Sequence, residues 1–169
     1  GAPQRTEADT DFDGRAETIT LFAGGAIQRT EKDSNSDGKP DLIAYYENGA
    51  IVRQEEDSDF DGVMDRKRST AQGGEQIQEL DSNGDGKTDT WLTLNQAGQV
   101  IQKSEDTLGS GKPNRIAHFQ NEKLVRFEQD SAGRGCMDLI QTYDTSGNVE
   151  EEQRDTNQNC KIDLWIFLR

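Results

Sequence analysis

The chain has 169 residues, a formal net charge of −14 and a hydrophobic content of only 30%. This acidity repels nucleic acids and anionic membrane surfaces, so we expect neither as a partner. The longest apolar run, residues 164–168, is far too short to span a bilayer, so no transmembrane segment is expected. A large buried core is also not expected, although aromatic and β-branched residues recur in an order that disordered chains lack.

An acidic loop recurs along the chain at an almost constant interval, with steps of 24, 24, 24, 25, 24 and 25 residues. Its copies begin at Asp9, Asp33, Asp57, Asp81, Asp106, Asp130 and Asp155. A fixed period in this range indicates a repeat architecture. Residues 1–8 match the end of a repeat, so residues 1–169 are predicted to form one array that begins within a repeat. No signal peptide is visible, and we expect any export signal to lie upstream of Gly1.

Every complete repeat has the same internal order: a nine-residue loop, a run such as "LIAYY", a turn such as "ENGA", and a run such as "IVRQE". Asn-Gly and Gly-Gly between short runs are strong hairpin signals, and runs of this length suit strands. The sequence therefore predicts an all-β fold, an elongated array of about seven 24-residue β-hairpin repeats with the acidic loops on one edge. It leaves open whether the array is a single-layer meander or solenoid-like.

Three apolar positions recur in register, and stacked repeats would align each of them into a row. The rows are Ile19, Ile43, Trp91, Ile116, Ile140 and Trp165; Phe22, Tyr46, Leu94, Phe119 and Tyr143; and Ile27, Ile51, Val100, Leu124 and Val149. We interpret them as the thin core of a stacked sheet, with an aromatic binding face as the alternative. Pairs such as Arg29 and Glu31 predict a solvated face with cross-strand charge pairing.

The first four loops follow the pattern D-x-[DN]-x-D-G-x-x-[DE]. Oxygen atoms at positions 1, 3 and 5 can converge on one cation, glycine at position 6 permits the bend that aims the carbonyl of residue 7 inward, and the carboxylate at position 9 closes the shell. Such an oxygen cage suits Ca²⁺, and the sequence has no Cys/His cluster for zinc. We expect about four Ca²⁺ ions. The predicted ligands are Asp9, Asp11, Asp13, Arg15 and Glu17; Asp33, Asn35, Asp37, Lys39 and Asp41; Asp57, Asp59, Asp61, Val63 and Asp65; and Asp81, Asn83, Asp85, Lys87 and Asp89.

This loop resembles the nine-residue calcium loop of the FG-GAP repeats in integrin α-subunits, which also ends at an acidic ninth position. Its likeness to an EF-hand stops after six positions, because Thr20, Ala44, Arg68 and Leu92 occupy position 12, where an EF-hand has glutamate. The half-repeat "YYENGAIVRQEE" is similar to bacterial variants of the MORN repeat. Together these resemblances imply a bacterial array of calcium-loop β-hairpins.

Charge supports a metal in these loops. The four loops hold 14 of the 33 carboxylates, and four Ca²⁺ ions would add eight positive charges and bring the net charge from −14 to −6. We infer that calcium is a folding element, since metal-binding free energy becomes folding free energy where the unfolded chain cannot hold the ion. Extracellular calcium modules bind at roughly 10⁻⁴ to 10⁻³ M. We therefore expect an extracellular, cell-surface or periplasmic protein.

The last three loops depart from the pattern. The fifth has Leu108 and Ser110 at ligand positions, and the sixth has Arg134 where a central carboxylate belongs, so neither is expected to bind calcium. The seventh, residues 155–163, lacks the glycine at position 6, and its calcium binding is left open.

Cys136 and Cys160 lie 24 residues apart, at neighbouring positions of the sixth and seventh loops. We expect them to form a disulfide, the alternative being two unrelated free thiols. In a meander, equivalent positions are two strands apart, about 9.6 Å, so the two loops would have to lean toward each other. Closing this segment should contribute roughly 3 to 4 kcal/mol of stability.

One repeat replaces its apolar strand with the basic residues Arg66, Lys67 and Arg68. These residues either dock an anionic protein or glycan or form a solvated strand that relieves charge. The lone histidine, His118, has no nucleophile partner in the sequence, and no enzymatic activity is predicted. The leading hypothesis is a calcium-stabilised extracellular or periplasmic protein with a structural, adhesive or surface-scaffold role. The alternative is a glycan- or protein-binding module that uses the aromatic residues of the apolar rows or residues 66–68.

Overall fold

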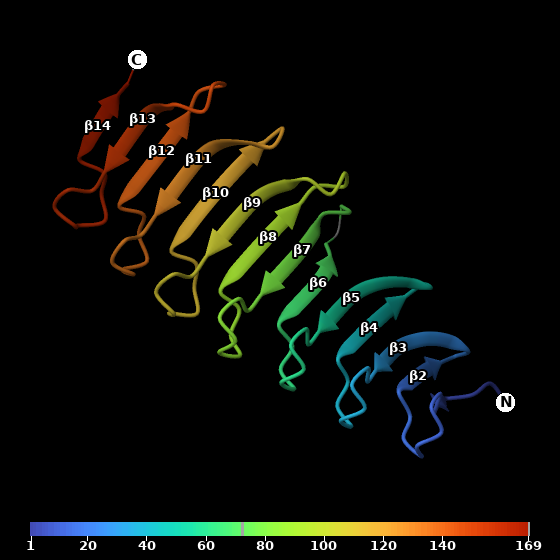
Figure 1. Ribbon diagram of the computed structural model, residues 1–169. Coiled ribbons are helices and arrows are strands. Elements are labelled where there is room, and N and C mark those ends of the chain that lie inside the picture. Colours follow the sequence, from blue (N-terminus) through green and yellow to red (C-terminus); the bar gives the residue numbers. More distant parts are fainter. Residues whose placement is uncertain (72, 169) are drawn as a thin grey trace.

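The computed structural model describes residues 1–71 and 73–168, which form one open antiparallel sheet (Figure 1). Its fourteen strands lie in chain order: β1 Arg5–Ala8, β2 Thr18–Ala23, β3 Ala26–Lys32, β4 Leu42–Glu47, β5 Ala50–Glu56, β6 Arg66–Thr70, β7 Gln76–Leu80, β8 Thr90–Leu94, β9 Val100–Glu105, β10 Arg115–Gln120, β11 Lys123–Gln129, β12 Leu139–Tyr143, β13 Val149–Arg154 and β14 Leu164–Phe167. The all-β prediction is confirmed, and the array is a single-layer meander. Among the described residues no helix is long and apolar enough to cross a bilayer.

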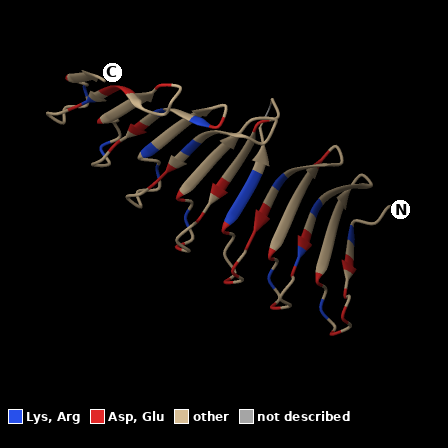
Figure 2. Cartoon of the chain, turned by 45° about the horizontal axis from the view of Figure 1, so that its top comes forward, with Lys and Arg blue, Asp and Glu red and all other residues tan. Residues whose placement is uncertain are grey.

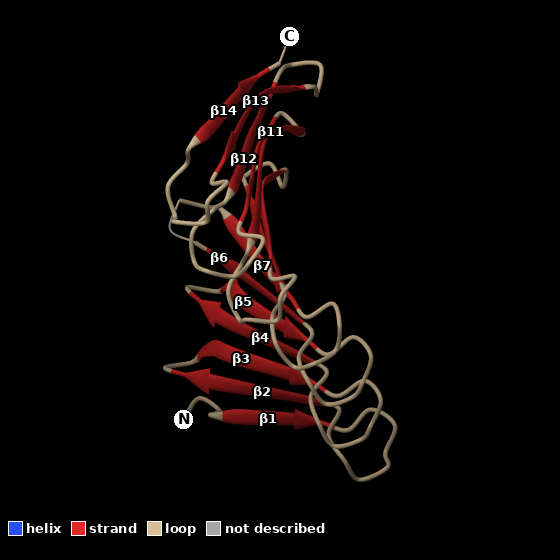
Figure 3. Ribbon diagram, turned by 90° about the vertical axis from the view of Figure 1, so that its left-hand side faces the viewer, coloured by secondary structure: helices blue, strands red, loops and turns tan. Residues whose placement is uncertain are grey.

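The two long edges of the sheet differ. All seven nine-residue loops lie along one edge and the tight turns lie along the other (Figure 1). At one of the turns, Asn48 and Gly49 both have positive φ angles, 51° and 80°, as a type I′ hairpin turn requires. Seen from the side, the sheet twists along its length and has no second layer (Figure 3). The twist follows from the right-handed preference of each strand.

Side chains alternate between the two faces, which separates the predicted apolar rows. Ile43 is paired with Glu31 on one neighbouring strand and with Glu55 on the other. The first predicted row therefore lies on one face of the sheet, where polar residues of the intervening strands interrupt it. We call this the Arg–Glu face, because Arg29, Glu31 and the equivalent residues of other repeats lie on it. The second and third rows merge on the opposite face near the turns, where Phe22 is paired with Ile27 across a register shift.

The sheet buries very little apolar surface. In the described part of the chain only three apolar residues are buried, Ile43, Ala44 and Leu94, whereas Ile51 is 49% exposed. The expected thin core is therefore absent from the described residues, because a single layer has no second layer to cover either face. Backbone ladders, cross-strand contacts and interactions between the loops must hold this fold together.

The Arg–Glu pairs join residues of the same strand, so the expectation of cross-strand charge pairing was wrong. Arg29 is 3.1 Å from Glu31, and Arg126 is 2.7 Å from Glu128. Residues i and i+2 of a strand share a face, which brings these side chains together. The cross-strand contact of the arginines is with an aromatic ring instead: Arg29 and Arg53 lie 5.4 and 5.5 Å from the ring centroid of Tyr45.

Candidate metal centre

All seven loops are built on the same pair of hydrogen bonds, which we call the loop frame. The first joins the N–H of position 6 to Oδ2 of the position 1 aspartate, as from Gly62 to Asp57 at 2.8 Å. The second joins the N–H of position 2 to the side chain at position 9, as from Ser58 to Asp65 at 2.7 Å. The frame folds each loop so that positions 1 and 9 face one another.

Two positions of each loop adopt left-handed backbone conformations. Position 6 has positive φ in every loop, with glycine in six of them and Cys160 at 66° in the seventh. Position 4 also has positive φ in every loop, including non-glycine residues such as Phe12 at 66° and Phe60 at 64°. The sequence pattern identified position 6 but missed position 4, where glycine in the fourth, fifth and sixth loops was the available signal.

In the first and third loops, carboxylates that the sequence pattern had selected lie close together. In the first loop, one oxygen each from Asp9, Asp11, Asp13 and Glu17 lie within 4.8 Å of one another. In the third loop the same holds for Asp57, Asp59 and Asp61. Such a spacing allows the oxygen atoms to bind one cation of the size of Ca²⁺, whose oxygen ligands lie 2.3–2.6 Å from the ion.

The central ligands are oriented by the main chain. The carboxylate at position 5 accepts a hydrogen bond from the N–H of position 7 in each of the first four loops, as at Asp85, which lies 2.9 Å from the nitrogen of Lys87. These N–H groups belong to the position 7 residues, whose main-chain carbonyl oxygens are the predicted ligands: Arg15, Lys39, Val63 and Lys87. In the second and fourth loops the position 3 amides, Asn35 and Asn83, accept from the N–H of position 5 at 2.9 Å.

Two carboxylate oxygens fit a cation because they are buried without a hydrogen-bond partner in the described part of the chain. They are Oε1 of Glu17 in the first loop and Oδ1 of Asp33 in the second. A buried carboxylate oxygen that lacks a donor carries a desolvation cost, which a metal ion would remove. The donor set of carboxylate and amide oxygens is the one that Ca²⁺ prefers.

The third loop shows the electrostatic tension within such a cluster. The hydrogen bond from the N–H of Asp61 lowers the pKa of Asp59, but desolvation and the charges of Asp61, Asp65 and Asp57 outweigh it, so the pKa is raised. The pKa of Asp65, by contrast, is lowered, mainly by the hydroxyl of Ser58. A divalent cation would neutralise the repulsion that raises the pKa of Asp59.

In the sixth loop an arginine side chain takes the place of a central ligand. Nη2 of Arg134 lies 3.6 Å from Asp138 in its own loop and 3.9 Å from Asp155 in the next loop. Its Nη1 donates a hydrogen bond of 2.8 Å to the carbonyl oxygen of Gln158. The guanidinium therefore supplies a fixed positive charge between the position 9 carboxylate of one loop and the position 1 carboxylate of the next.

Successive loops also contact one another directly. The N–H of each position 1 residue from Asp33 onward donates to the carbonyl oxygen of position 9 in the preceding loop, as from Asp57 to Asp41 at 2.8 Å. Between the second and third loops and between the third and fourth, the side chain at position 7 also reaches position 6 of the following loop: Lys39 occupies the space that a Cβ on Gly62 would need, and Val63 lies 3.8 Å from the place of a Cβ on Gly86. The array of loops is thus a packed edge of the sheet.

The disulfide uses this same contact. Cys136 is at position 7 and Cys160 at position 6 of the following loop, and they are bonded with a Cα–Cα distance of 5.5 Å. The predicted pairing is therefore seen in the structure. The loops lean together as a meander requires, because position 7 already reaches position 6 of the next loop elsewhere in the array.

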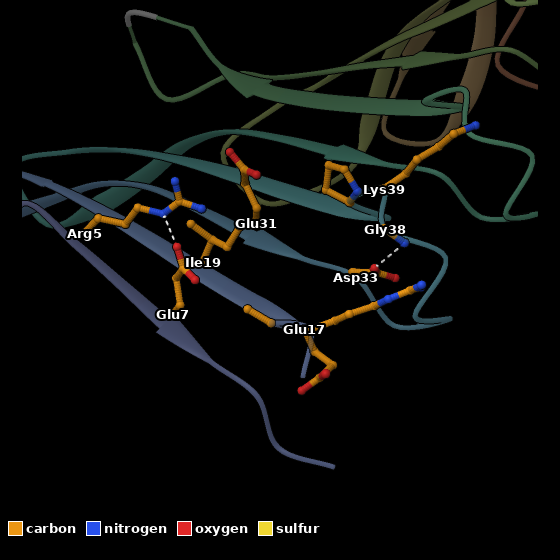
Figure 4. A pocket seen from close by; sticks show the side chains of 11 residues that line it. Arg5, Glu7, Glu17, Ile19, Glu31, Asp33, Gly38 and Lys39 are labelled. Atoms are coloured by element: carbon orange, nitrogen blue, oxygen red, sulfur yellow. Dashed lines mark hydrogen bonds and ion pairs between the residues drawn. The ribbon is translucent and has the colours of Figure 1, made fainter. Parts of the chain in front are cut away.

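An open groove of about 280 Å³ lies between the first two loops and the adjoining strands (Figure 4). Its lining includes the ion pair of Arg5 and Glu7, at 2.8 Å, and Asp33, whose carboxylate accepts from the N–H of Gly38 at 2.8 Å. The charges in this groove are only partly paired, because Glu17 and Asp33, which also line it, each keep one buried oxygen without a hydrogen-bond partner in the described part of the chain.

The basic strand β6 stands out in an acidic sheet (Figure 2). Its alternation places Arg66 and Arg68 on one face, both exposed, and Lys67 on the Arg–Glu face. Lys67 is paired in register with Glu55 and Glu79 on the two neighbouring strands. The three residues therefore do not share one surface.

Comparison with known proteins adds no family assignment: no protein-family model matches the chain, and no curated protein is significantly similar to it.

Proposed function

We propose that this chain is a calcium-stabilised β-repeat protein that works outside the cell or in a periplasm, in a structural, adhesive or surface-scaffold role. The observation that carries the proposal is the first loop, where four carboxylates converge within 4.8 Å on the loop frame. The other three loops with the full pattern share that frame, so we propose about four Ca²⁺ ions per chain. The likeness of these loops to FG-GAP calcium loops supports the same proposal.

Calcium would supply stability that the sheet lacks. With three buried apolar residues in its described part, the fold gains little from the hydrophobic effect. A site with a dissociation constant of about 10⁻⁴ M would add roughly 2 kcal/mol at about 5 mM free calcium. Four such sites would be a large share of the stability of a domain of this size.

Two features support a location outside the cytosol. Calcium sites of millimolar or submillimolar affinity are filled only where calcium is abundant. The disulfide between Cys136 and Cys160 belongs to an oxidising compartment. Both conditions hold outside the cell and in a periplasm.

Calorimetric titration with Ca²⁺ tests the metal proposal, with Asp85→Ala and Ser110→Ala as a matched pair. Both residues are at position 5 and both accept a hydrogen bond from the N–H of position 7, at 2.9 and 3.2 Å. Only Asp85 offers a carboxylate in a loop with the full pattern. We expect the wild-type chain to bind about four ions, Asp85→Ala to lose one, and Ser110→Ala to lose none.

The proposal fails if the wild-type chain gives no calcium heat in the millimolar range and its melting temperature is the same in chelator. The loss of one ion in both variants would also contradict the proposal, because the effect would then come from disturbed loop folding and not from the loss of a metal ligand. Titration with Mg²⁺ in place of Ca²⁺ should give weaker binding, since Mg²⁺ demands a tighter octahedral shell.

A second candidate function is the binding of an anionic protein or glycan, and the exposed pair Arg66 and Arg68 favours it. Because Lys67 is on the other face, between Glu55 and Glu79, it provides the control. Arg66→Ser/Arg68→Ser should abolish binding on a glycan array, whereas Lys67→Ser should not. If neither variant changes binding with or without calcium, the strand serves only to relieve charge.

A further inference from the structure

The two exposed arginines of the basic strand β6 share one face of the sheet but differ in their surroundings (Figure 2). Arg66 lies opposite Glu56 on β5, and it lines a groove at the loop edge together with Asp65 and Asp81. The hydroxyl of Ser58 and, to a smaller extent, the charge of Arg66 lower the pKa of Asp65. Acidic residues close to Arg66 therefore offset its charge.

Arg68 has no such counter-charge. Its register partners are the neutral residues Gln54 on β5 and Gln78 on β7, and residues paired in this way share a face. Within the described part of the chain no carboxylate forms an ion pair with Arg68. Its guanidinium, a planar fork of five N–H donors, can therefore bind a carboxylate from outside.

Arg68 also lines a shallow hollow of about 90 Å³ between β5 and β6. On the same face, the lining includes Gln54, Thr70 and Gln76, together with Ile51, which is 49% exposed. No side-chain hydrogen bond between described residues uses the amide of Gln54 or Gln76 or the hydroxyl of Thr70. The hollow thus combines unpaired polar groups, an apolar surface and one guanidinium.

A second arginine at this hollow, Arg53, is already engaged. It forms an ion pair with Glu55 and lies 5.5 Å from the ring centroid of Tyr45. Arg68 is therefore the cation of the hollow that a ligand can use.

We propose that this hollow binds a sugar residue with a single carboxylate, such as a uronic acid, within an otherwise neutral glycan. Arg68 would bind the carboxylate through two parallel N–H···O bonds. The amides of Gln54 and Gln76 would exchange hydrogen bonds with ring hydroxyl groups, and Ile51 would pack against the apolar side of the ring. This inference rests on the second candidate function and deepens it, because it names the class of glycan and assigns its recognition to Arg68 and not to Arg66.

An isolated carboxylate fits this surface better than a polyanion does. One guanidinium neutralises one charge, and a chain with a net charge of −14 repels an acidic peptide or a sulfated polymer that carries many charges. Amide groups both donate and accept hydrogen bonds, as hydroxyl groups do, so the neighbours of Arg68 suit a sugar.

An array of oligosaccharides that alternate a uronic acid with a neutral sugar tests the proposal. The neutral counterparts are the same oligosaccharides after reduction of their carboxylates to alcohols. We expect the wild-type chain to bind the acidic form about 10- to 100-fold more tightly than the reduced form, as hydrogen bonds to a charged group imply.

The matched variants are Arg68→Gln and Arg66→Gln. Both remove one positive charge from an exposed position of the same strand face, so they change long-range attraction equally. Arg68→Gln should lose the preference for the acidic form, whereas Arg66→Gln should keep it. Gln54→Leu should weaken the binding of both forms, because it removes hydroxyl contacts and leaves the guanidinium in place. Circular dichroism checks that each variant retains the sheet.

Several outcomes would overturn this inference and leave the second candidate function standing. They are equal binding of the acidic and reduced forms by the wild-type chain, a preference that survives in Arg68→Gln or is lost equally in Arg66→Gln, affinities unchanged in Gln54→Leu, and tighter binding of an acidic peptide. A wild-type chain that binds neither the oligosaccharides nor the peptide would overturn the second candidate function itself.

Discussion

The first four loops and the last three share one backbone frame but differ in what neutralises their acidic residues. In the first four, carboxylates and amides fill positions 3 and 5, and the proposed neutralising charge is Ca²⁺. In the sixth loop, the guanidinium of Arg134 lies near Asp138 and Asp155, and a disulfide joins the sixth loop to the seventh. With the proposed calcium ions bound, the same edge of the sheet would be held together by two different kinds of chemistry.

This difference separates two roles that the sequence pattern combines. Asp130 still accepts from the N–H of Gly135 at 2.6 Å, although Arg134 occupies a ligand position of its loop. In the fifth loop, Asn114 replaces the position 9 carboxylate and still accepts from the N–H of Thr107 at 2.7 Å. Positions 1 and 9 therefore hold the loop frame in all seven loops, whereas we propose that positions 3 and 5 decide whether a metal binds.

The largest expected effect is the response of the two regions to chelation. Removing calcium should lower the melting temperature markedly, because each lost site would remove roughly 2 kcal/mol at about 5 mM free calcium. Hydrogen exchange should accelerate from β2 to β8, whose loops carry the full pattern, and change less from β11 to β14. Equal acceleration along the whole sheet would contradict the division into two regions.

The next largest effect concerns the covalent staple. Cys136→Ser/Cys160→Ser should lower the free energy of unfolding by about 3 kcal/mol, by the chain-entropy estimate for a loop of this length. The number of bound Ca²⁺ ions should not change, because the calcium loops lie in the other region. Denaturant titration and calorimetry on the same samples provide both readouts. A reducing agent should destabilise the wild-type chain and leave the double variant unaffected; a loss of calcium would show that the regions are coupled.

The fold could be predicted from the sequence to a large extent because each signal is local. The turn residues and the strand length are visible within one repeat, and the constant period carries them along the chain. Together they predict the fourteen strands and the acidic edge. The choice between meander and solenoid depends on contacts between repeats, which these signals do not contain. For the same reason the prediction that the apolar rows form a core was wrong: Ile43 is buried, but its partners on the two neighbouring strands are Glu31 and Glu55.

The loop site shows the same limit. Ligand positions such as Asp9, Asp13 and Glu17 could be selected by residue type, and the structure brings them together. The hydrogen bonds of the loop frame could not be predicted from residue type, because their donors are main-chain N–H groups, which every residue except proline carries. The position of Arg134 between two loops was also not predictable, since it requires knowing that position 5 of one loop lies beside position 1 of the next.

A third prediction converts one region into the other. Ala132→Asn/Arg134→Asp changes the sixth loop to "DSNGDGCMD", whose first six positions are those of the fourth loop. Because the frame is already present, the variant should bind one more Ca²⁺ and gain roughly 2 kcal/mol at about 5 mM free calcium.

In chelator the same variant should be less stable than the wild-type chain, because the hydrogen bond from Arg134 to Gln158 is lost. Ala132→Asn alone keeps the guanidinium in place and should bind no additional calcium. If the double variant binds none either, the frame and the ligand positions are not sufficient for a site.

The smallest effect is a pH dependence of the frame itself, measured in chelator. The hydrogen bond from the N–H of Thr156 lowers the pKa of Asp163, at position 9 of the seventh loop. A lowered pKa means that the ionised carboxylate stabilises the fold above the unfolded-state value of about 3.9, and that this contribution is lost as the pH falls through the folded-state pKa. Asp163→Asn should therefore lower the melting temperature near neutral pH, and the difference from wild type should vanish in strong acid. If the difference in melting temperature between Asp163→Asn and the wild-type chain persisted in strong acid, position 9 would stabilise the loop through packing and not through its charge.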